Sequence, residues 1–176
     1  PGSRGMGLEH QAAAVLGRGY RTKYEYVVGD PVNRIDPSGL TVSCTYHQGT
    51  GAMTCVDDDS GYRVIDDQGY SGTGVGRDNP AAQCMAFLGP PPAGTYRIGP
   101  GFYDENLGRM TLPLTPGPGN NMCDPEAAGH RHPPRRGFYM HGDNATNDAS
   151  EGCIIMGYST RRAINDRGGG TVTVVP

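Results

Sequence analysis

The stretch that decides the fold is FYMHGDNATNDASEGCIIM, residues 138–156. Two short apolar runs, residues 138–140 and 154–156, predict buried strands on either side of a polar loop. His141 directly follows the first run, and Cys153 immediately precedes the second. Because functional side chains concentrate where loops meet a rigid scaffold, we predict that His141 and Cys153 belong to one site.

A cysteine and a histidine in one site support acyl transfer. The cysteine attacks a carbonyl as its thiolate, and the imidazole takes the thiol proton and, once charged, lowers the thiol pKa. Gly152 lets a substrate approach closely, and backbone N–H groups near Gly152 and Cys153 are candidates to bind the oxyanion. The alternative is that Cys153 is a small buried core residue and His141 an ordinary loop histidine, and spacing alone does not separate the two.

The order of these residues resembles the active-site signature of L,D-transpeptidases. His-Gly at 141–142 is followed by Ser-x-Gly-Cys-Ile at 150–154, where that family usually has Ser/Thr-His-Gly-Cys. Glu151 stands in the place of the second histidine, and this variant resembles the diverged branch found in type VI secretion L,D-transpeptidase effectors. Further matching stretches are residues 70–72, 79–80, 89–90 and 94–98, so the resemblance runs from about Tyr62 to the C-terminus. It implies a mainly β fold with short helices, an L,D-transpeptidase-like β-sandwich or barrel.

The resemblance also implies roles for single residues. Cys153 is the expected nucleophile and His141 the general base and then acid, with Gly152 and Ser150 as oxyanion or orienting residues. The expected substrate contacts are Tyr70, Ser71, Gly142, Asp143 and Glu151. Ser150 is alternatively a partner of His141, Glu151 either orients His141 or binds the substrate's amine, and Asp143 either orients the imidazole or only forms a turn. No cofactor and no metal is implied.

The function implied is that of an antibacterial toxin. It would act on peptidoglycan tetrapeptide stems in the periplasm of a target bacterium, as an L,D-carboxypeptidase or by exchanging the terminal D-amino acid. The implied partners are a cognate immunity protein and the type VI secretion apparatus. Two alternatives stay open: a cysteine peptidase or amidase of another specificity, and a non-catalytic binding module with an inert Cys153.

A second resemblance covers the N-terminal part of the chain. Residues 24–40 resemble the end of an Rhs-repeat core, with Pro31 followed after four residues by Asp-Pro-Ser-Gly-Leu at 36–40. It implies that residues 1–40 end an Rhs core, that residues 41–176 form the toxin domain, and that an Rhs shell is a partner. Cleavage after Leu40 would use Asp36 as one carboxylate of a pair, and such a pair needs a second acid close by.

Five cysteines predict two disulfides and one free thiol. Residues 48–51 form a four-residue hairpin loop, and this register places Cys44 directly opposite Cys55, near disulfide reach. The alternatives are two reduced cysteines or a metal pair with His47. Cys84 with Cys123 is the second expected bond, which leaves Cys153 free and indicates an oxidising destination.

The remaining pattern is that of a loop-rich β domain. Glycine (29 residues) and proline (15 residues) punctuate short alternating apolar runs. The strands that we expect are residues 41–47, 52–56, 62–65, 95–98, 110–114 and 171–175, with a turn at 66–69. The expected helices run from Asn79-Pro80 to Gly89 and from a cap at Ser159 or Thr160 to Asp166.

Charge and hydropathy exclude some partners. A net charge of −3 and a pI near 5.9 argue against a general nucleic-acid or anionic-membrane binder. No apolar run approaches the roughly 18 residues that span a bilayer, and no signal peptide opens the chain, so we expect another carrier to export it. His130 and His132 with His141 also allow a zinc site, which is disfavoured because it leaves the Ser-x-Gly-Cys segment unexplained.

Overall fold

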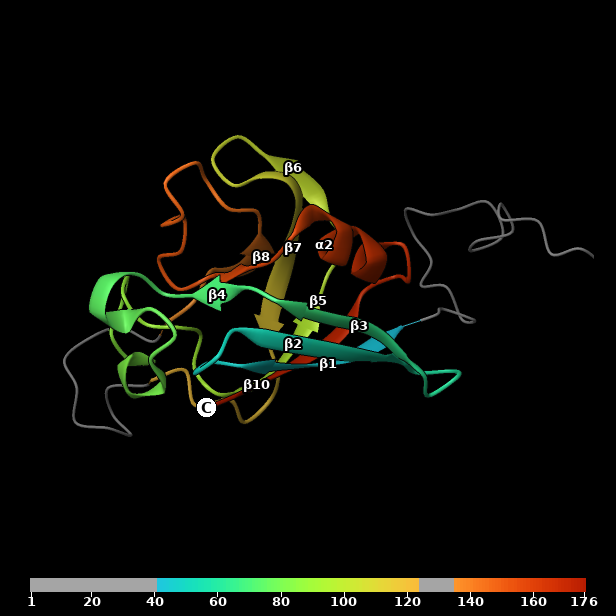
Figure 1. The fold of residues 1–176 in the computed structure, drawn as a ribbon. Helices are drawn as coiled ribbons and strands as arrows, with labels where there is room; N and C mark the ends of the chain where they lie inside the picture. The colour runs from blue at the N-terminus through green and yellow to red at the C-terminus, as the bar shows by residue number, and fades with distance from the viewer. Residues whose placement is uncertain (1–40, 124–134) are drawn as a thin grey trace, which may run out of the picture. The chain divides into compact units, whose positions relative to one another are not determined.

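One curved sheet of ten strands forms the framework of the computed structural model, which describes residues 41–123 and 135–176 (Figure 1). The strands are β1 (Val42–His47), β2 (Ala52–Asp57), β3 (Arg63–Gln68), β4 (Tyr70–Ser71), β5 (Gly94–Ile98), β6 (Phe102–Asp104), β7 (Gly108–Pro116), β8 (Phe138–His141), β9 (Ile154–Ile155) and β10 (Gly170–Val175). Within the described residues there is one α-helix, α2 (Tyr158–Asn165), and two 3₁₀ turns, η2 (Gly74–Gly76) and η3 (Pro80–Ala82).

The sheet curls into a nearly closed barrel. Its strand order is β3-β2-β1-β10-β5-β7-β8-β9-β4, with β6 paired to β7, so β3 and β4 stand at opposite ends of the order. Gly69 alone joins these two strands along the chain, which brings the ends of the sheet together. A Cβ at Gly69 would clash with the carbonyl oxygen of Ile155, so only glycine fits there. The predicted mainly β, barrel-like fold is confirmed.

The first hairpin follows the predicted register. β1 and β2 pair antiparallel with Cys44 opposite Cys55, and the two sulfurs are bonded. The predicted turn at residues 66–69 is wrong, because β3 continues to Gln68. Its polar residues pair with the backbone of β2 while the side chains of Asp66 and Gln68 face solvent, so the backbone ladder outweighs the weak β-propensity of these residues.

The predicted helix from residue 79 to 89 is also wrong. Asn79 caps a helical start as expected, accepting from the N–H of Ala81, but only η3 forms. Beyond it the backbone makes successive turns instead of an α-helical ladder, and Phe87 has a left-handed φ of 62°. Cys84 therefore lies in a turn, where it is bonded to Cys123 as predicted.

The C-terminal helix starts earlier than predicted. α2 begins at Tyr158, and Gly157 stands at its N-cap. The hydroxyl of Thr160, one of the two expected caps, instead donates to the carboxylate of Asp67. α2 packs against β7 (Figure 1). Its Ile164 is buried in the core together with Tyr96, Met140 and Leu112. No helix among the described residues is long and apolar enough to cross a membrane.

Candidate active site

Two short parallel strands bring His141 and Cys153 into one cleft. β8 pairs with β9 so that Met140 lies opposite Ile154 and His141 opposite Ile155. Continued by one residue, this register sets Cys153 beside Tyr139, on the same sheet face as His141. His141 and Cys153 both line a cleft of about 670 Å³.

The imidazole of His141 is buried and oriented by the next residue. Its Nδ1 lies 2.8 Å from the carbonyl oxygen of Gly142, which can only accept, so Nδ1 carries the proton and Nε2 is left as the base. Burial lowers the pKa of His141, and the charge of the nearby Arg161 lowers it further. The hydrogen bond to Gly142 and the charges of Asp143 and Asp104 raise this pKa, but by less. The imidazole is therefore uncharged at neutral pH. Gly142, expected as a substrate contact, uses its carbonyl to orient His141.

The thiol of Cys153 is half-buried and free, as the cysteine count predicted. Burial raises its pKa, and the charge of Glu151 adds to this rise. A hydrogen bond from the backbone N–H of Tyr139 and the charge of Arg135 act in the opposite direction. An uncharged thiol and an uncharged imidazole thus line the same cleft, and transfer of the thiol proton to Nε2 would produce the nucleophilic thiolate.

Ser150 organises the turn that leads into Cys153. Its fully buried hydroxyl donates to the carbonyl of Cys153 at 2.7 Å and accepts from the N–H groups of Gly72, at 2.8 Å, and Gly152, at 3.2 Å. Ser150 is therefore occupied by backbone groups and does not hold His141. The N–H of Gly152, one of the expected oxyanion donors, is already bonded to this hydroxyl.

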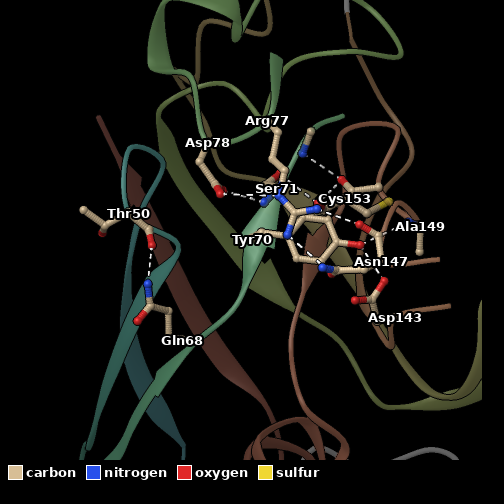
Figure 2. A network of polar contacts seen from close by, with 12 residues as sticks. Thr50, Gln68, Tyr70, Ser71, Arg77, Asp78, Asp143, Asn147, Ala149 and Cys153 are labelled. Atoms are coloured by element: carbon tan, nitrogen blue, oxygen red, sulfur yellow. Dashed lines mark hydrogen bonds and ion pairs between the residues drawn. The ribbon is translucent and has the colours of Figure 1, made fainter. Parts of the chain in front are cut away.

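The side chains of Tyr70 and Ser71 contact the segment from Asp143 to Cys153 (Figure 2). Both are buried, and the Ser71 hydroxyl donates to the Cys153 carbonyl at 2.8 Å. The Tyr70 hydroxyl donates to Asp143 at 2.5 Å and accepts from the N–H of Ala149 at 3.0 Å. Tyr70 thus anchors the loop of residues 143–149, and Ser71 holds the carbonyl of Cys153. The expected role of these side chains as substrate contacts stays a prediction.

Two features of the cleft carry no signal in the sequence. Arg135 is buried beside Cys153, and its guanidinium donates to three carbonyls of residues 83–90, a role that a basic pair in a proline-rich segment does not reveal. Phe87 lines the cleft from a turn that sequence patterning assigned to a helix. Glu151 lies exposed at the cleft, where it can meet a ligand.

Some expected sites fall outside the described residues. Asp36, Leu40 and the whole Rhs-like segment belong to residues 1–40. His130 and His132 of the alternative zinc site belong to residues 124–134. These remain predictions.

Comparison with known proteins identifies a family for this chain. Residues 66–175 match the family described as the Tlde1 domain. No curated protein matches the sequence. A similar solved structure is the helical cell shape determining protein Pgp2 from Campylobacter jejuni, with 11% identity, a TM-score of 0.47 and coverage of 78% of this chain. This chain spans about half (48%) of that protein. Since the family match covers more than half of the chain and contains both His141 and Cys153, the chain belongs to the Tlde1 domain family of type VI secretion L,D-transpeptidase effectors.

Proposed function

We propose that this protein is an antibacterial type VI secretion effector that modifies peptidoglycan stem peptides by acyl transfer at Cys153. The observation that carries the proposal is the pairing of a free cysteine with a histidine whose Nδ1 is fixed by the Gly142 carbonyl, in one cleft. Membership of the Tlde1 domain family supports peptidoglycan as the substrate class.

The reaction follows from the positions of these groups. Nε2 of His141 takes the thiol proton, and the Cys153 sulfur attacks the carbonyl carbon of the third stem residue. The bond to the terminal D-alanine breaks, His141 returns its proton to the leaving amine, and a thioester remains on Cys153. Water then releases the tripeptide, or a free D-amino acid or another stem's amine takes the acyl group. Because Ser150 engages the Gly152 N–H, the N–H of Cys153 is the oxyanion donor left from the expected pair.

Charges in the cleft suit a stem peptide. Arg136, exposed at the cleft, can bind a carboxylate of the stem, while Glu151 and Asp148 can bind the free amine of the diamino acid. Removal of D-alanine makes a stem unfit as a cross-linking donor, which is how the toxin would weaken a competitor's wall. We further propose action in the target's periplasm, a cognate immunity protein and delivery with an Rhs shell.

The test is mass spectrometry of purified tetrapeptide muropeptides incubated with the wild type and with Cys153→Ala, with and without a free D-amino acid. Loss of one D-alanine, or its replacement, by the wild type alone is the expected result. Cleavage at another bond would instead support a peptidase or amidase of different specificity. Unchanged masses with folded, disulfide-intact protein would overturn the proposal and favour a binding module.

A further inference from the structure

Two buried arginines, Arg135 and Arg161, lie close to Cys153 and His141, the proposed reacting pair. Arg135 and Arg161 are 8% and 4% exposed, and neither forms a salt bridge within the described residues. Each donates to three backbone carbonyls: Arg135 to Gln83, Gly89 and Pro90, and Arg161 to Met156, Arg109 and Met110. Because a buried cation without an anion is costly, both positions call for a reason beyond packing.

Each arginine lies against the glycine beside one member of the pair. A Cβ at Gly142, next to His141, would lie 2.9 Å from an Nη of Arg161. A Cβ at Gly152, next to Cys153, would clash with an Nη of Arg135. Because neither glycine has a side chain, the Arg161 guanidinium can pack against the residue next to His141, and the Arg135 guanidinium against the residue next to Cys153.

Within the described residues, different charged groups act on Cys153 and on His141. The charges of Arg135 and Glu151 act on the thiol, and Glu151 opposes thiolate formation. The charge of Arg161 lowers the pKa of His141, whereas the charges of Asp143 and Asp104 raise it. Glu151 occupies the position where the wider family has a second histidine, so besides a protonated His141 the positive charge that acts on the thiol is that of Arg135.

We propose that Arg135 and Arg161 are positioning residues that act on different members of the pair: Arg135 supplies the positive charge that stabilises the Cys153 thiolate, and Arg161 keeps His141 an uncharged base. The inference rests on the proposed function in taking Cys153 and His141 as the reacting pair. It goes further in assigning opposite electrostatic tasks to two residues outside the signature.

The two arginines serve as each other's control, because Arg135→Met and Arg161→Met each remove three hydrogen bonds to backbone carbonyls. Two quantities are measured on the folded, disulfide-intact protein: the pH dependence of Cys153 alkylation by iodoacetamide, and the titration of His141 by NMR. Arg135→Met should raise the alkylation midpoint by about one pH unit, about tenfold in rate below the midpoint, and leave the His141 midpoint in place. Arg161→Met should raise the His141 midpoint by about one unit and leave the thiol midpoint in place.

Arg135→Lys keeps the test decisive if Arg135→Met fails to fold. Lysine keeps the charge but loses the guanidinium fork, so the proposal predicts a wild-type thiol midpoint in a less stable protein. A raised midpoint in Arg135→Lys, or equal shifts of both midpoints in both methionine variants, or no shift in either, would overturn the proposal. Neither readout uses peptidoglycan, so a failure of the proposed activity on muropeptides is seen independently of this result.

Discussion

The two sides of the barrel are held together in different ways. On one side β1, β2, β3 and β10 are six residues each and are paired along most of their length. On the cleft side β4 and β9 have two residues each, and side chains such as Ser71, Ser150 and Arg135 satisfy the backbone carbonyls and N–H groups. Every buried backbone group needs a partner, and where the ladder is short, side chains must supply it. The cleft is therefore the side that single side-chain changes should disturb most.

The largest expected difference between the two sides concerns the disulfides, one on each. Cys84–Cys123 closes a sequence separation of 39 residues and Cys44–Cys55 one of 11. Loop-closure entropy predicts losses of about 4 and about 3 kcal/mol of unfolding free energy when each pair is replaced by alanine. Activity of the folded fraction should fall only for the Cys84–Cys123 pair, because the neighbouring Gln83 accepts from Arg135, and Ala86 and Phe87 line the cleft.

Denaturant unfolding and muropeptide turnover, both normalised to folded protein, measure this difference. The Cys44→Ala, Cys55→Ala variant is the control, since its disulfide joins β1 to β2 in the core. The side formed by β1, β2, β3 and β10 is the regular side of the barrel. Equal loss of activity in both double variants would show that the cleft side depends on its disulfide no more than the regular side does.

Two glycines with positive φ offer a second contrast. Gly152 has φ +121° and adjoins Arg135, whereas Gly61, in the turn between β2 and β3, has φ +69° and open space around its Cβ position. Gly152→Ala should displace either Cys153 or the guanidinium, and a misplacement of about 1 Å costs about 100-fold in kcat/KM. Gly61→Ala should cost about 1 kcal/mol of stability through backbone strain and leave kcat/KM unchanged. Steady-state kinetics that show the two variants alike would contradict the assigned role of Gly152.

The regular side could be predicted from the sequence because local signals determine it. The Gln48–Gly51 loop fixes the β1–β2 register, and that register alone places Cys44 opposite Cys55. The prediction failed at residues 66–68, where pairing with β2 extends a strand through polar residues.

That His141 and Cys153 share a cleft could be predicted, but the construction of the cleft could not. His141 and Cys153 stand at strand ends in a recognisable order, whereas Tyr70 and Ser71 reach Asp143, Ala149 and the Cys153 carbonyl across more than 70 residues of sequence. Such contacts depend on how β4 pairs with β9, and a two-residue strand has no pattern of its own. Arg135 is hidden for the same reason, because its partners are backbone carbonyls that any sequence would provide.

The smallest expected effect tests whether Tyr70 serves the loop or the substrate. Tyr70→Phe removes one hydroxyl that bonds Asp143 and Ala149 but keeps the ring, over which the Arg77 guanidinium lies at 3.6 Å. Burial and the Asp143 bond raise the pKa of Tyr70 to about 12, so the hydroxyl stays protonated and the bond persists throughout the neutral range. We expect a loss of about 1 kcal/mol in stability and a several-fold rise in KM with little change in kcat, because the loop that Tyr70 holds lines the cleft through Asn144 and Asp148.

Tyr62→Phe is the matched control on the regular side, where the ring is 76% exposed and the loss should stay within about 0.5 kcal/mol. A loss of kcat in Tyr70→Phe larger than the rise in KM would argue that the hydroxyl takes part in the chemistry itself. A change confined to KM and stability would instead assign Tyr70 the same role as Ser71 and Ser150. These side chains bond backbone groups that have no partner in the short strands, and so they keep the turn before Cys153 in position.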